Sequence, residues 1–182
     1  MAVSPQDILD FWYSERVQKL WFVSTPEFDE EIREKFEALW EMAEQGLLDD
    51  WCENAEGSLA LAIVLDQFPL NMYRNTAKGF STEAKSIIVA RLAIEKGFDE
   101  QLDKDKLGFL LMPLMHSEDL AIQDMSVEMF KKHELEANIR FAEHHRGLIQ
   151  EFGRFPHRNE MLDRTNTAEE ELYLNSKRAF LG

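Results

Sequence analysis

The sequence predicts an all-α fold of about eight helices, arranged as a single all-helical domain over residues 1–182. Three observations support this prediction. Only 8 glycines and 5 prolines occur in 182 residues, which favours long helices over many short strands. Helix-capping residues recur along the chain, and the apolar residues between them repeat at helical spacing. The connections are short, so we expect consecutive helices to pack as antiparallel hairpins.

Most of the expected helices open at a residue whose side chain can cap a helix N-terminus. In chain order these residues are Ser4, Thr25, Ser58, Ser81 or Thr82, Asp103 or Asp105, Ser117 and Thr167. A further helix is expected from about residue 138 to Phe152. The natural helix stops are Gly46, Gly97 and Gly153.

The run LALAIVLDQF after Ser58 is apolar on nearly every side. A helix of this kind is typical of the centre of a helical domain. We therefore expect it to be buried, and we expect Pro69 to bend or end it.

The formal net charge is −15, and residues 1–60 hold 15 acidic and 4 basic side chains. Such a surface repels phosphate backbones and anionic lipids, so nucleic acids and membranes are not expected partners. The longest run without a charged residue, Leu107 to Ser117, is too short to span a bilayer. The first residues also lack the features of a signal peptide, so we expect a cytoplasmic protein.

Cys52 is the only cysteine, so an internal disulfide and a cysteine zinc cluster are both excluded. The usual metalloprotease and nucleotide-binding motifs do not occur in the sequence. We therefore expect no metal and no cofactor.

Asp66 stands on the buried helix in line with Leu59. A carboxylate in that position must be paired or hydrogen-bonded. It is either part of a ligand site or a structural contact that fixes the helix end against an arginine or the backbone. Gln67, Asn71 and Arg74 follow it and are candidate ligand-binding residues.

His116 ends an apolar helix and is followed by Ser117 and Glu118. Ser117 as a cap and Glu118 as an acid of the first turn need no functional explanation. If the site is catalytic, His116 or His157 is the candidate acid or base, and Asp66 or Glu118 would orient it.

His145 shares a helical face with Phe141, Leu148 and Phe152. It should therefore point inward, whereas His144 should point outward. His145 is either a ligand-binding candidate or a core histidine with its hydrogen bonds satisfied.

Residues 140–164 contain five of the ten arginines, three of the five histidines and no lysine. Arginines without lysines suggest fixed, bidentate contacts to carboxylates or phosphates. In this segment Arg154, Arg158 and Asn159 are candidate ligand-binding residues. The alternative is that they clamp the protein's own acidic side chains and helix ends.

Three motifs occur in order: DQFP at 66–69, MHSE at 115–118 and FGRFPHRN at 152–159. Together they resemble the uncharacterised bacterial family called domain of unknown function 924, of the tetratricopeptide-repeat-like superfamily. The resemblance implies a right-handed superhelix of helical hairpins, and it implies no activity. Leu70 stands where this family usually has an arginine, and Asp163 stands where it usually has a glycine.

Three functions fit these observations. The first is a binding module with a polar groove for a peptide or a small anion, in which Arg74, Arg154 and Arg158 are the donors. The second is an enzyme that uses histidine and carboxylate acid–base chemistry on a small metabolite. The third is a structural polar core in a protein that acts through its outer surface.

Two structural predictions follow, because polar groups set among core residues need partners. We expect four groups to lie together: Asp66, His116, His145 and the loop 154–159. Their side chains should be separated by no more than about one helix diameter, about 10–12 Å. We also expect Arg154 or Arg158 to contact a carboxylate of the protein itself, with Asp66 and Glu118 as the favoured acceptors.

Overall fold

The computed structural model describes residues 3–180, and this part of the chain is helical without any β-strand. Eight α-helices in it have seven or more residues: α1 (Pro5–Trp12), α3 (Pro26–Glu44), α4 (Ala55–Ala62), α6 (Glu83–Glu95), α7 (Lys104–His116), α8 (Leu120–Lys132), α9 (Glu136–Phe152) and α10 (Ala168–Leu174). Two shorter α-helices are α2 (Glu15–Gln18) and α5 (Phe68–Met72). The all-α prediction is confirmed.

The described chain also contains five short turns of other helix types. They are η1 (Asp49–Glu53), the π-helical turn η2 (Ile63–Gln67), η3 (Ala77–Phe80), η4 (Phe98–Glu100) and η5 (Pro156–Arg158).

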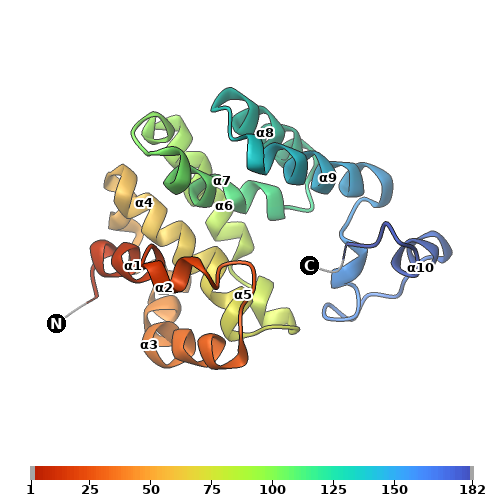
Figure 1. Cartoon of the computed structure of the whole chain (residues 1–182), viewed down its shortest axis with the longest axis horizontal. Coiled ribbons are helices and arrows are strands. Elements are labelled where there is room, and N and C mark those ends of the chain that lie inside the picture. The colour runs from red at the N-terminus through yellow and green to blue at the C-terminus, as the bar shows by residue number, and fades with distance from the viewer. Residues whose placement is uncertain (1–2, 181–182) are drawn as a thin grey trace.

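The helices pack largely in chain order (Figure 1). Helix α4 contacts α1, α6 and α7, so it lies near the centre of the fold. Helices α6, α7, α8 and α9 each contact the next, and the segment that ends in α10 lies beyond α9 (Figure 1). No helix within residues 3–180 combines the length and apolar character needed to cross a membrane.

The central helix begins earlier than the sequence predicts. Asn54, not Ser58, is the N-cap of α4, because its side-chain oxygen accepts a hydrogen bond from the N–H of Gly57. Ser58 lies inside the helix, and its hydroxyl donates to the carbonyl of Asn54. The apolar run continues through η2 into α5, and Pro69 is the second residue of α5, directly after the π-helical turn.

Three predicted caps are confirmed, since the side chains of Ser4, Thr25 and Thr167 accept hydrogen bonds at the starts of α1, α3 and α10. The predicted cap of α8 is wrong. Asp119 caps that helix by accepting from two backbone N–H groups, while Ser117 ends α7.

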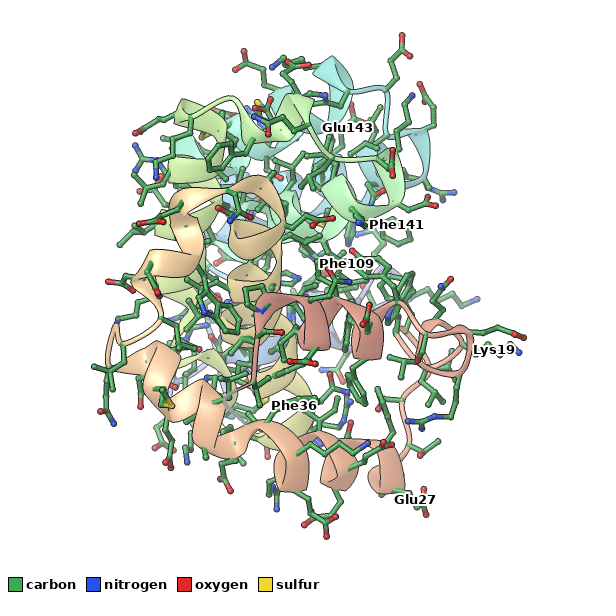
Figure 2. The ribbon with its side chains drawn as sticks, turned by 90° about the vertical axis from the view of Figure 1, so that its left-hand side faces the viewer. Lys19, Glu27, Phe36, Phe109, Phe141 and Glu143 are labelled. Carbon is green, nitrogen blue, oxygen red and sulfur yellow. The ribbon has the colours of Figure 1, made fainter. Side chains whose placement is uncertain are left out.

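Buried apolar side chains of the described chain form two clusters. The larger core lies among α1, α3, α4 and α7 and holds many aromatic rings. Phe36, labelled in the side view of Figure 2, packs its ring 4.9 Å from that of Phe11 on α1. The smaller core comprises Leu148, Ile149, Phe155 and Tyr173 at the C-terminal end.

Candidate functional site

Asp66 is placed by the π-helical turn η2 between α4 and α5. Pro69 has no N–H to donate to the carbonyl of Leu65, four residues earlier. The hydroxyl of Thr82 donates to that carbonyl over 2.6 Å, and the indole N–H of Trp40 donates to the same hydroxyl oxygen over 3.1 Å. This relay holds the turn on which Asp66 stands, and π-helical turns occur frequently at functional sites.

The carboxylate of Asp66 is buried and contacts His116, with Oδ1 lying 2.9 Å from Nδ1. Its other oxygen, Oδ2, accepts from the Gln67 amide over 2.6 Å. A carboxylate at Nδ1 holds the proton there, which leaves the lone pair of Nε2 free to accept. Among the described residues, no group donates a hydrogen bond to Nε2 of His116.

Arg158 is almost fully buried beside this pair. Its Nη1 donates to Glu83 Oε2 over 2.8 Å, and its Nη2 donates to the backbone carbonyl of His116 over 2.9 Å. The guanidinium carbon lies 4.6 Å from the ring centre of Phe80 and 4.6 Å from that of Phe155, so two aromatic rings hold it. Burial raises the pKa of Glu83 in spite of this arginine.

These side chains surround a small cavity, which we call the central pocket. It is lined by Leu65, Asp66, Leu70, Gly79, Phe80, Glu83, His116 and Arg158. Its volume of about 10 Å³ is close to that of one water-sized sphere.

A second polar network, the C-terminal clamp, consists of Glu118, Arg154, Asn159, Arg164 and Glu170. Arg164 binds both oxygens of Glu118, at 2.6 and 2.9 Å, and Arg154 binds both oxygens of Glu170, at 2.7 and 2.9 Å. Asn159 bridges the two pairs through hydrogen bonds to Arg164 and Glu170.

The electrostatics of the clamp follow from these bonds. The Arg154 guanidinium lowers the pKa of Glu170 to about 2. Burial by itself raises the pKa of Glu118, but hydrogen bonds from Arg164 and from the N–H of Phe155 outweigh burial and lower it.

Both arginines contact carboxylates of the protein itself, as predicted, but the predicted acceptors are wrong. Arg154 binds Glu170 and Arg158 binds Glu83, whereas the expected acceptors were Asp66 and Glu118. Arg164, Glu83 and Glu170 were not among the site residues predicted from the sequence. Arg164 is the last arginine of the lysine-free segment 140–164, so the composition of that segment contained its signal.

The two other histidine candidates lie beside the clamp. The Nδ1–H of His145 donates to the carbonyl of Phe141 over 2.8 Å, and its ring centre lies 5.5 Å from that of Phe155. Burial lowers the pKa of His145 to about 3 and that of His157 to about 4. His145 points inward as predicted, but Phe141, expected on the same buried face, is 57% exposed.

Contacts join most of the predicted cluster. Asp66 touches His116, the carbonyl of His116 accepts from Arg158, and Phe155, within the loop, packs against His145 and His157.

Asn71 and Arg74 do not join the cluster. The Asn71 amide donates to Asp29 Oδ1 over 2.7 Å, and Arg74 Nε donates to Asp29 Oδ2 over 2.7 Å. Both bind the first turn of α3 to the end of α5.

The structure adds a group that the sequence analysis missed. Ligand atoms of Asp99, Glu100 and His133 lie within 4.8 Å of one another, as metal ligands do. The ammonium of Lys132 lies 2.9 Å from Asp99 Oδ2 and 2.6 Å from Glu100 Oε1. A lysine therefore already supplies the positive charge at these carboxylates.

Comparison with known proteins places this geometry in a family. The model of the family described as "Bacterial protein of unknown function (DUF924)" matches residues 8–178. The chain belongs to this family. A similar solved structure is that of the protein of unknown function ATU0120 from Agrobacterium tumefaciens, with a TM-score of 0.87 and 36% identity over 94% of this chain and 96% of that one. No curated protein shows a significant match.

The structure locates both of the positions at which the sequence motifs were expected to differ. Leu70 lines the central pocket. Asp163 has a φ of 52°, in the left-handed region that favours glycine.

Proposed function

We propose that this DUF924 protein is a binding module whose site is the central pocket, and that its ligand is a small polar molecule that donates a hydrogen bond to Nε2 of His116. The observation that supports this proposal is the orientation of His116. Asp66 fixes Nδ1 at 2.9 Å, and Nε2 has no donor among the described residues. The His116 side chain is 18% exposed, so a ligand can reach this nitrogen.

The arginines no longer favour an anion as the ligand. Arg74, Arg154 and Arg158 each bind a carboxylate of the protein itself. The pocket wall carries two carboxylates, Asp66 and Glu83, against one guanidinium. Its formal charge therefore favours ligand groups that donate hydrogen bonds, and a peptide is too large for the pocket as it stands.

An enzyme is the second candidate, and the Asp66–His116 pair favours it. A carboxylate at Nδ1 with a free Nε2 is the arrangement in which histidine acts as a general base. In this alternative Asp66 orients His116, and Nε2 removes a proton from a bound substrate. The residues of the C-terminal clamp fit the third function, a structural polar core, since their side chains satisfy one another's hydrogen bonds.

The tetratricopeptide-repeat-like right-handed superhelix and a cytoplasmic location are parts of the same proposal. The superhelix is supported by the packing of α6 against α7, α7 against α8 and α8 against α9. The cytoplasmic location is supported by the acidic composition and the single cysteine.

A ligand screen tests the proposed function. We would record the thermal midpoint of the protein with a library of small alcohols, amines, amides and carboxylates. A ligand of the pocket should raise the midpoint of the wild type and not that of His116→Gln. The matched control is His133→Gln, since His133 is also bound to a buried carboxylate, Asp99, at 2.8 Å. Stabilisation that survives in His116→Gln, or no stabilising compound at all, would exclude this site.

A further inference from the structure

Three polar atoms around the central pocket have no hydrogen-bond partner among the described residues. The Nε–H of Arg158 is fully buried and unpaired, although the other two nitrogens of that side chain are bonded. His116 lines the same pocket, and its Nε2 accepts no hydrogen bond from the described residues. Glu83 binds Arg158 through Oε2, which leaves Oε1 as a second free acceptor.

An unpaired buried N–H destabilises the folded state, so it is rare in a stable fold. All three residues line the same cavity, whose volume of about 10 Å³ matches one water-sized sphere. One oxygen atom there could accept from Arg158 and donate to His116 or Glu83.

We propose that the central pocket is a site for one hydroxyl oxygen, which is a water molecule in the resting protein and an alcohol group of the ligand in the bound state. The part about the ligand rests on the proposed function, whereas the part about the water does not. The oxygen accepts a hydrogen bond from Arg158 Nε–H and donates one to His116 Nε2.

The donor and acceptor pattern excludes other ligand groups. An ammonium group can donate to His116, but it has no lone pair to accept from Arg158. A carboxylate can accept from Arg158, but it cannot donate to His116, and it would lie against the carboxylate of Glu83. A ligand that displaces an ordered water must reproduce the hydrogen bonds of that water, and a hydroxyl group reproduces both.

The water is tested first, in the wild-type protein. We would measure rotating-frame Overhauser effects between water and the arginine Nε–H protons of ¹⁵N-labelled protein. Arg158 is assigned through its own side-chain carbons and checked by loss of the signal in Arg158→Lys. A cross-peak to water is expected at Arg158 Nε–H. The Nε–H of Arg154, which donates directly to Glu170 at 2.7 Å, is the internal control. Absence of the Arg158 cross-peak would overturn the proposal.

The ligand class is tested with three probes of similar size: methanol, methylammonium chloride and sodium formate at equal concentrations. Methanol should shift the ¹⁵N resonance of His116 Nε2 and remove the water cross-peak of Arg158, and the other two should do neither. The Nε2 resonance of His133, which is already bound to Asp99, should not move. An equal response to methylammonium or formate would overturn hydroxyl selectivity.

The two proposals can fail separately. If the water cross-peak is present and methanol alone displaces it, but no larger compound stabilises the protein, the hydroxyl site stands and the binding module does not. If a compound binds through His116 while Arg158 shows no water, the binding module stands and the hydroxyl site does not.

Discussion

The Asp66 carboxylate and the His116 imidazole lie 2.9 Å apart, although 50 residues separate them in the sequence. Asp66 comes from the π-helical turn η2, and His116 is the last residue of α7. The pair therefore forms only when η2 packs against α7. Any function of His116 depends on that packing as well as on the two side chains.

We expect the proton of neutral His116 to reside on Nδ1, because Asp66 accepts it there. Replacing Asp66 with Asn should give a mixture of the two tautomers, since an amide can either accept from Nδ1–H or donate to Nδ1. Long-range ¹H–¹⁵N correlation spectra report the tautomer directly. His145, whose Nδ1 faces the Phe141 carbonyl, should keep its Nδ1–H form in both proteins. A wild-type His116 with its proton on Nε2 would contradict the proposed acceptor.

Arg158→Met should destabilise the protein by about 3–5 kcal/mol, because it leaves the carboxylate of Glu83 without its buried partner. The matched control is Arg178→Met, which removes an exposed pair with Glu151 at 3.4 Å and should cost at most about 1 kcal/mol. Urea denaturation measures both values. Similar costs for the two variants would show that Arg158 is not a buried anchor.

Thr82→Val should cost about 1–3 kcal/mol, because it keeps the shape of the side chain but removes the hydroxyl that donates to the buried Leu65 carbonyl. Thr82→Ser retains the hydroxyl and should cost less. The same denaturation experiment compares the two variants. In Thr82→Val, the Trp40 indole N–H also loses its acceptor, so its proton resonance should shift. If valine is tolerated as well as serine, the relay does not support the turn.

The free energy of unfolding should fall as the pH is lowered below about 6.5, the ordinary histidine pKa. Burial lowers the pKa of His145 to about 3 and of His157 to about 4 in the folded protein, so the unfolded chain takes up protons first. The two neutral histidines make their full contribution to the free energy of unfolding above pH 6.5. That contribution decreases as the pH falls toward 4 for His157 and toward 3 for His145. Each histidine contributes a slope of at most about 1.4 kcal/mol per pH unit.

Denaturation curves between about pH 5.5 and 6.5 separate this effect from the carboxylates. Carboxyl groups such as Glu170 have an ordinary pKa of 4.5 and stay largely ionised in the unfolded chain over that range. His145→Gln and His157→Gln should each reduce the slope. The control His144→Gln changes an exposed neighbour of His145 and should leave the slope as it is. Equal slopes in all four proteins would disprove the assignment.

Asp163→Gly should stabilise the protein by up to about 1 kcal/mol, because glycine adopts a positive φ without the steric cost of a Cβ. The φ of Asp163 is 52°. Asp163→Ala should give no such gain, since alanine keeps the Cβ that makes a positive φ costly. Thermal midpoints decide the order of the three proteins, and a glycine variant less stable than the wild type would refute the strain argument.

The helices were predictable because caps and apolar periodicity are local properties. The start of α4 at Asn54 was missed because Ser58, a good cap by itself, lies one turn inside the helix. The inward position of His145 followed from helical spacing, but the exposure of Phe141 did not, since spacing does not show how far a neighbouring element extends over a face.

The site was predictable as a set of residues and not as a set of pairs. Arg158 and Glu83 are separated by 75 residues, and Arg164 and Glu118 by 46. Several acids lie within reach of these arginines once the chain has folded. Which acid each arginine binds depends on tertiary packing, and composition contains no information about it.

The small C-terminal core has a consequence for local unfolding. Phe155 and Tyr173 bury their rings in a cluster separate from the main core, and polar bonds such as Arg158–Glu83 attach this segment to the other helices. Regions that are joined to a protein by few apolar contacts open at a lower free energy than its core. Backbone amides of residues 153–180 should therefore exchange with deuterium together, and earlier than those of α4 and α7. Arg158, which lines the central pocket, belongs to this segment, so the pocket loses one side when the segment opens.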